Sequence, residues 1–170
     1  MCNHGYAIVS TMPTTRGEWV LLAYRLPREP STPRIALWRR LRRLGAAQVV
    51  DGLVALPRDT RTQEQLEWLA DEVLEAGGEA SVWLAVPGSS AQDRALATRM
   101  AESIASEYRV VIEAARAARL KEHAARRAQA LARLRRTLRT IQARDFFPPP
   151  EREHARHAVE ELARVVEVAR

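Results

Sequence analysis

Five arginines in one short segment carry the clearest chemical signal in the sequence. Residues 31–45 read S-T-P-R-I-A-L-W-R-R-L-R-R-L-G, so that basic and large apolar residues are interleaved. A guanidinium presents a planar fork of N–H donors that fits phosphate and other oxyanions, and it stays charged at every physiological pH. The segment therefore predicts either a helix that binds an anion or a core helix with a solvated outer face. The basic residues are Arg34, Arg39, Arg40, Arg42 and Arg43.

Helical periodicity separates these arginines into two groups. At about 100° per residue, Arg34 falls between Trp38 and Leu41 on the apolar face, and the other four fall on the opposite side. For Arg34 the alternatives are a structural ion pair or a hydrogen bond to strand-end carbonyls, and an anion site beside the amides of the helix N-terminus. For the outward arginines they are a solvated face and contact with phosphates. The candidate anion-binding residue is Arg34, and the candidate nucleic-acid contacts of this helix are Arg39, Arg42 and Arg43.

A second, denser basic segment lies between residues 121 and 144. Its only acidic residue is Glu122, and it holds most of the positive excess of the chain. A charge run of this kind is also typical of a soluble Arg/Ala-rich helix whose leucines pack on a neighbour. If DNA is the partner, this helix should make much of the contact. The candidate nucleic-acid contacts here are Arg126, Arg127, Arg133, Arg135 and Arg136.

No pattern typical of catalysis accompanies the basic segments. The sequence has no glycine-rich phosphate loop, no G-x-S-x-G motif and no combination of His and Cys that suggests a nucleophile. His154 and His157 lie three residues apart, but the sequence supplies no third metal ligand at a recognisable spacing. We therefore expect a protein that is not an enzyme and that carries neither a metal nor a cofactor.

Composition narrows the class of partner and the compartment. The chain has 170 residues, 46% of them hydrophobic, a formal net charge of +6 and a sequence pI near 10.6. It is long enough for a compact domain with a core, and its charge favours an anionic partner. The lone Cys2 suits a reducing cytoplasm, and no segment approaches the ~20 apolar residues of a membrane span. We expect a cytoplasmic protein without a membrane partner, with residues 1–17 as a flexible tail.

The elements that position the first basic segment have the order strand, helix, strand, strand, helix, strand. This order is the split βαβ arrangement of ferredoxin-like domains, and we assign it to residues 18–88. Thr32 and Gly45 are expected to cap the first helix, and the Asp51-Gly52 pair predicts a two-residue hairpin turn. Thr62 with Gln65 matches a capping box for the second helix. The predicted elements are strand 19–27, helix 32–45, hairpin strands 48–50 and 53–56, helix 62–76 and strand 79–87.

A helical region, residues 89–170, is expected to follow and to pack on the ferredoxin-like domain. Residues 90–143 contain neither proline nor glycine, which predicts one very long helix or two helices that break near Leu120. The prolines at 148–150 end that region, and a last helix is predicted for 151–168. Phe146 and Phe147 should anchor the turn in the core. Trp68 lies opposite the apolar face of its helix, and we interpret it as the contact for the C-terminal helices rather than a subunit contact. The fold class is therefore α+β.

Several separate motifs, in this order along the chain, resemble one known family. They are R-I-A-L-W-R-R-L-R-R-L-G-A, D-G-L-V-A-L-P, L-E-W-L-A-D-E-V-L-E-A-G-G-E-A, E-Y-R-V-V-I and I-Q-A-R-D-F-F. Together they are similar to the N-terminal domain of the ChrB chromate-resistance proteins, from about Trp19 to the last helix. Two departures stand out: longer family members carry a further C-terminal domain, and the segment before I-Q-A-R-D-F-F is often more acidic in the family than here.

The resemblance implies a bacterial cytoplasmic protein associated with chromate resistance, commonly a chromate-responsive regulator of a chromate-efflux operon. Combined with the basic helices, it gives our first hypothesis, a homodimeric transcriptional regulator that binds DNA mainly through phosphates and responds to chromate. The alternative is an oxyanion-binding or protein-binding resistance protein without a role on DNA.

Overall fold

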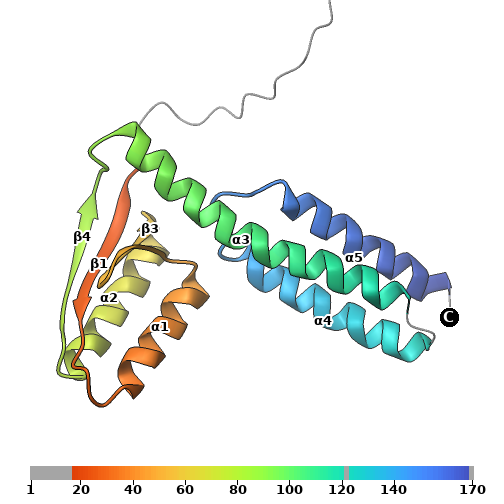
Figure 1. Cartoon of the computed structure of the whole chain (residues 1–170), viewed down its shortest axis with the longest axis horizontal. Coiled ribbons are helices and arrows are strands. Elements are labelled where there is room, and N and C mark those ends of the chain that lie inside the picture. The colour runs from red at the N-terminus through yellow and green to blue at the C-terminus, as the bar shows by residue number, and fades with distance from the viewer. Residues whose placement is uncertain (1–16, 121–122, 169–170) are drawn as a thin grey trace, which may run out of the picture.

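A computed structural model describes residues 17–120 and 123–168 and contains a mixed α+β sheet domain joined to a helical region (Figure 1). The four strands have the order β2-β3-β1-β4, and every neighbouring pair is antiparallel. Helices α1 and α2 lie on the same side of this sheet (Figure 1). The predicted ferredoxin-like βαββαβ arrangement is therefore confirmed. The elements are β1 (Trp19–Arg25), α1 (Thr32–Leu44), β2 (Ala47–Val50), β3 (Leu53–Pro57), α2 (Thr60–Glu75) and β4 (Glu79–Ala85).

Strand β1 lies inside the sheet and supplies the centre of the first core. Val20 and Leu22 are fully buried on the face that packs on α2. On the opposite face, Trp19 is 3% exposed and stacks on Phe147, which returns from the far end of the chain. The nearly continuous apolar run of this strand thus reflects full burial on the face toward α2 and partial burial on the other face, where Leu21 is half-buried.

The Asp51-Gly52 hairpin is confirmed between β2 and β3. Gly52 has φ +75°, in the left-handed region where a side chain is disfavoured, and a Cβ there would lie 2.6 Å from the carbonyl oxygen of Tyr24. The amide of Tyr24 in turn donates a 2.7 Å hydrogen bond to the Gly52 carbonyl oxygen. The turn therefore needs glycine for its backbone angle and for its close approach to β1.

Helix α1 differs from the predicted wheel in two side chains. Leu37 and Leu41 are buried as expected, and Gly45 ends the helix in the left-handed conformation. Trp38, however, is 51% exposed, and Arg34 is exposed as well, so the predicted inward positions of both are wrong. A helical wheel gives the direction of a side chain but not what covers it. Trp38 lies at the flank of the buried stripe, and Arg34 lies in the first turn, where no element covers it.

Helix α2 begins two residues earlier than predicted and is capped differently. Asp59 accepts a 2.7 Å hydrogen bond from the Thr62 amide, and the Thr62 hydroxyl accepts from the Asp59 amide, so Thr62 is the third helical residue of the box. Trp68 is 66% exposed, and the helices that follow do not cover it. The predicted contact between Trp68 and the C-terminal helices is therefore wrong.

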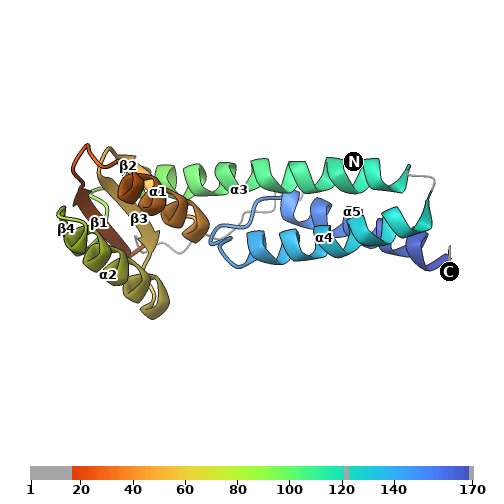
Figure 2. The ribbon, with the colours of Figure 1, turned by 90° about the horizontal axis from the view of Figure 1, so that it is seen from below.

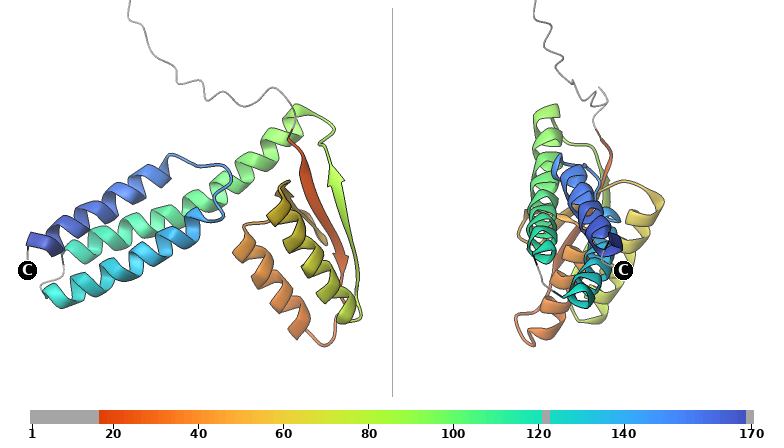
Figure 3. Two further views of the ribbon diagram at one scale, coloured as in Figure 1. Left: turned by 180° about the vertical axis from the view of Figure 1, so that it is seen from behind. Right: turned by 90° about the vertical axis from the view of Figure 1, so that its right-hand side faces the viewer.

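The helical region forms a three-helix bundle with a core of its own. It consists of α3 (Ser90–Arg119), α4 (Ala124–Gln142) and α5 (Glu151–Val168), and the break follows Leu120 as predicted. The bundle extends away from the sheet domain, and α3 runs through both parts (Figures 2 and 3). The 17 buried residues of this core run from Ile104 to Val166, whereas Met100 near the start of α3 belongs to the core of the sheet. The described residues of the helical region thus pack mainly on one another.

Some expectations fall on residues that the structure does not describe. Most of the predicted tail, residues 1–16, lies outside the described ranges, and so do Lys121 and Glu122. Among the helices of the described residues, we find none with the length and apolar character needed to traverse a membrane.

The hairpin gives a direct test of the first core. We expect Gly52→Ala to lower the free energy of unfolding by more than the about 1–2 kcal/mol that a left-handed residue with a side chain costs, because the new methyl also collides with backbone. Gly77→Ala is the matched control, since Gly77 has φ +74° but no atom lies within 4 Å of a Cβ added there. Urea unfolding of both variants measures the difference, and equal losses of stability would contradict the close approach.

Candidate nucleic-acid interface

Helix α4 carries its basic residues outward because its apolar residues recur at helical spacing on one side. The buried side chains pack against α3 and α5, and the remaining positions face solvent. The helix contains six arginines and no acidic residue. It therefore presents positive charge without a compensating charge of its own. The buried residues are Ala130, Leu131, Leu134, Leu138 and Ile141.

Five of the six arginine side chains of α4 are exposed and form no ion pair or hydrogen bond within the described residues. The sixth, Arg127, is half-buried. Three of the five line a surface hollow of about 320 Å³ together with Gln129 and Ala130. A row of guanidinium groups with free donors is suited to the spaced oxyanions of a nucleic-acid backbone. The five are Arg126, Arg133, Arg135, Arg136 and Arg139, and the three at the hollow are Arg126, Arg133 and Arg136.

Most arginines of α3 and α5 differ from those of α4, because five of the eight form an ion pair with a carboxylate. Arg109 pairs with Glu151 across the two helices at 2.7 Å, and Arg119 pairs with Glu161 at 2.5 Å. The Arg109 hydrogen bond lowers the pKa of the Glu151 carboxyl below its ordinary value. Charge on this side of the bundle is balanced locally, so the positive potential is concentrated on α4.

The candidate contacts of α1 form a separate, smaller surface. Arg39 and Arg43 are exposed, and their side chains have no partner among the described residues. The Arg42 guanidinium lies over the Trp38 ring, 5.0 Å from its centroid. Arg40 forms an ion pair with Glu72 of α2. Helix α1 approaches the end of α4 only at its own carboxyl end, so the eight predicted contacts lie on two surfaces, not one.

Arg34 lies on the surface near the start of α1. One of its terminal nitrogens donates a 3.1 Å hydrogen bond to the carbonyl oxygen of Arg28, in the loop that follows β1. Of the alternatives that the sequence leaves for Arg34, a hydrogen bond to carbonyls near the end of the first strand matches this geometry best. The structure does not bring Arg34 together with the other candidate residues.

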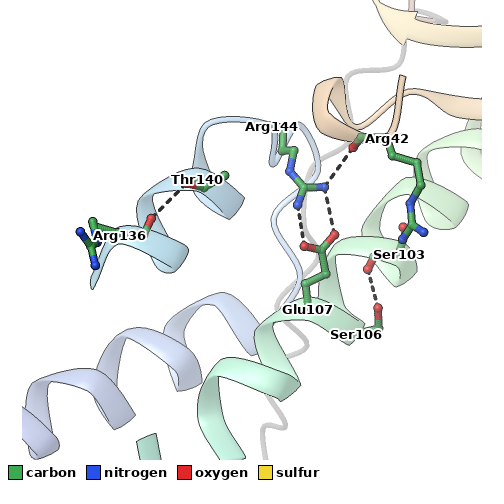
Figure 4. Close-up of polar contacts among 7 residues, drawn as sticks. All are labelled: Arg42, Ser103, Ser106, Glu107, Arg136, Thr140 and Arg144. Carbon is green, nitrogen blue, oxygen red and sulfur yellow. Dashed lines mark hydrogen bonds and ion pairs between the residues drawn. The ribbon is translucent and has the colours of Figure 1, made fainter. Parts of the chain in front are cut away.

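The segment that follows α4 joins the two parts of the molecule through Arg144. Its guanidinium forms two hydrogen bonds with Glu107 of α3, at 2.9 and 2.5 Å, and donates a third, of 3.3 Å, to the carbonyl oxygen of Arg42 at the end of α1 (Figure 4). This arginine therefore satisfies a helix-terminal carbonyl and is held by a carboxylate, unlike the arginines of α4.

Asp145 makes the next contact in this segment, with the buried Tyr108 of α3. The Tyr108 hydroxyl donates a 2.8 Å hydrogen bond to Asp145 Oδ2, and the Arg152 guanidinium lies 3.7 Å from the same oxygen. Burial, followed by the hydrogen bond to Asp145, raises the pKa of the Tyr108 hydroxyl above its ordinary value. The hydroxyl therefore remains protonated and acts as a donor. We call residues 144–147, with sequence R-D-F-F, the connector.

Sequence reasoning found the connector only in part. It expected Phe146 and Phe147 in the core, and both are half-buried against the sheet core. It counted Arg144 with the basic surface and did not single out Glu107, because nothing local relates two residues that lie 37 positions apart. The available signal was the family resemblance, because R-D-F-F ends the motif I-Q-A-R-D-F-F, and Glu107 and Tyr108 begin the motif E-Y-R-V-V-I.

Comparison with known proteins supports the same relationship. The family model described as "Protein ChrB, N-terminal" matches residues 34–168, a range that includes most of α1, the whole bundle and the connector. The chain belongs to the ChrB N-terminal family. A curated relative, Protein ChrB of Cupriavidus metallidurans, is 32% identical over 133 residues. No solved structure matches the chain significantly.

The match to Protein ChrB covers less than half of that relative's length. The aligned residues make up 76% of this chain but 40% of the length of the Cupriavidus relative. The resemblance therefore concerns one part of that longer protein. It agrees with the departure noted from the sequence, that longer ChrB proteins continue beyond this region.

The connector can be tested by removing one hydroxyl. We expect Tyr108→Phe to lower the free energy of unfolding by about 1–3 kcal/mol, because Asp145 stays buried with Arg152 as its remaining partner. Tyr24→Phe serves as the control, since the Tyr24 hydroxyl makes no hydrogen bond within the described residues. Chemical unfolding followed by far-UV circular dichroism measures both variants. A loss of stability in Tyr108→Phe no larger than in Tyr24→Phe would contradict the role of the hydroxyl.

Proposed function

We propose that the chain is a chromate-resistance-associated regulatory protein that binds DNA through the outward face of α4. Membership of the ChrB N-terminal family supports the association with chromate resistance. The observation that carries the DNA proposal is the set of five exposed α4 arginines without a carboxylate partner in the described residues. In this proposal the protein works in the cytoplasm by binding and not by catalysis.

The geometry of α4 favours a polyanion over a single small anion. The helix has 19 residues, which corresponds to a length of about 28 Å. Arginines from Arg126 to Arg139 occupy most of that length and most of the solvent-facing arc, so that one compact anion could contact few of them. A DNA backbone offers repeated phosphates along and across such a surface.

The contacts available to α4 are typical of backbone positioning. Arginines spread around the solvent side of a helix neutralise phosphates, whereas base recognition needs a few side chains directed into a groove. Arg39 and Arg43 of α1 add a second, smaller basic surface that is separate from that of α4. We therefore expect this chain to supply affinity and orientation on DNA, with only modest preference for base sequence.

The alternative without DNA assigns the same arginines to an acidic protein or an oxyanion. The hollow lined by Arg126, Arg133 and Arg136 is the observation that favours it, because a small dianion could lie among three guanidinium groups. The two proposals differ in the salt dependence and the size of the ligand, and the following experiments separate them.

Replacement of the hollow arginines tests the DNA proposal. We expect the triple variant Arg126→Gln/Arg133→Gln/Arg136→Gln to bind operon-upstream DNA at least about tenfold more weakly at moderate salt. The slope of log K against log salt should also fall by about 0.9 for each phosphate that the variant no longer neutralises. Fluorescence anisotropy across a salt series measures both quantities.

A charge-matched variant controls for the change in net charge. Arg116→Gln/Arg156→Gln/Arg164→Gln removes the same charge from exposed positions of α3 and α5, outside the proposed surface. We expect it to retain the wild-type slope. DNA binding that is absent at low salt in the wild-type protein, or equally weakened binding in the two triple variants, would refute the proposal.

Direct response to chromate can be measured without DNA. If chromate binds the folded chain, it should raise the melting temperature, since a ligand at about 100 times its dissociation constant adds about 2.7 kcal/mol of stability. If the anion site lies at Arg34, as the sequence predicts, the shift should be lost in Arg34→Lys, which keeps the charge but not the bidentate fork. A shift unchanged in Arg34→Lys but lost in the α4 triple variant would move the anion site to the hollow.

A further inference from the structure

Strand β4 forms an open edge of the sheet. It is outermost in the order β2-β3-β1-β4 and pairs only with β1 among the described residues. Its seven residues keep a continuous register with β1, without a bulge, and include no proline, glycine or basic residue. Trp83 is 60% exposed and Leu84 is 50% exposed. A long, regular, apolar edge of this kind is a template for pairing with another strand.

The other edge of the same sheet is protected. Strand β2 has four residues and an irregular register with β3 between Gln48 and Val50. Arg99 of α3 donates a 2.6 Å hydrogen bond to the carbonyl oxygen of Gln48, so this oxygen already has a donor. A short strand, a register shift and a covered carbonyl are the features that prevent edge pairing. The described β4 edge lacks all three.

We propose that β4 pairs antiparallel with β4 of a second copy of this chain, about a two-fold axis at Val82. This register places Trp83 opposite Ser81 of the second copy and Leu84 opposite Ala80. Each large exposed side chain then faces a small one, so the strand is complementary to itself, as a two-fold interface requires. The two sheets join into one sheet across both copies.

Charge favours a second copy at this edge. Glu79 is the only charged residue of β4, and the proposed register places it opposite Ala85 of the second copy, so no like charges meet. The unpaired arginines of α4 lie in the bundle, which extends away from the β4 edge (Figure 1). Two copies joined through β4 therefore keep their basic helices apart, whereas a dimer through α4 would oppose them.

The homodimer expected from the sequence thus acquires a defined surface. This inference does not rest on the proposed DNA role, since it uses none of the α4 residues and its test contains no nucleic acid. Failure of one proposal leaves the other standing.

The experiment compares two exposed tryptophans. Sedimentation equilibrium of the full chain over a range of micromolar concentrations should show a monomer–dimer equilibrium. We expect Trp83→Lys to weaken dimerisation at least about tenfold, because it removes the aromatic contact and places two lysines on neighbouring positions of one sheet face. Trp68→Lys makes the same chemical change at a position that is 66% exposed on α2, and it should leave the dimer intact.

Three results would overturn the inference: a wild-type chain that stays monomeric throughout, a Trp83→Lys dimer as tight as the wild type, or dissociation caused by Trp68→Lys. Circular dichroism establishes that each variant is folded. Leu84→Lys provides a second variant on the opposite side of the strand and should weaken the dimer as well, so the inference stays testable if Trp83→Lys fails to fold.

Discussion

The bidentate ion pair between Arg144 and Glu107 holds the structure at the point where its parts meet. Both side chains are largely shielded, with 17% and 32% exposure, and the same guanidinium reaches the last turn of α1. A pair in such a place adds little net stability, because removal of the two charges from water offsets much of their attraction. Its directional hydrogen bonds instead fix how the connector, α1 and α3 lie against one another, and the position of α4 follows from that arrangement.

The same residue type therefore has two roles in this chain, and its neighbours decide which. Arg144 and Arg109 face carboxylates and serve the fold. Arg126 and Arg133 face solvent without such a partner in the described structure, and their donors remain available to a ligand. The amino-acid composition gives only the total number of arginines and does not separate paired from unpaired side chains. A net charge of +6 thus understates how strongly the positive charge is concentrated on one helix.

Local signals in the sequence predicted most of the elements, and non-local contacts explain the failures. The hairpin at Gly52, the end of α1 at Gly45 and the break after Leu120 depend on the chemistry of a few adjacent residues, and all three were predicted correctly. Trp68 was assigned to a helix that does not cover it, because periodicity shows which face is unusual but not what lies against it. The basic surface of α4 was visible as a charge run, although its lack of carboxylate partners depends on the packing of three helices.

Helix α3 couples the two halves of the molecule as a single rod. It has 30 residues, about 45 Å in length, and its buried positions begin in the core of the sheet with Met100 and continue into the core of the bundle with Tyr108. No glycine or proline interrupts it. Gain or loss of one residue between these two cores would rotate the bundle by about 100° relative to the sheet. The number of residues in α3 therefore fixes the orientation of the bundle relative to the sheet domain. Its length is thus a constraint on evolution that an exposed surface loop without such contacts does not share.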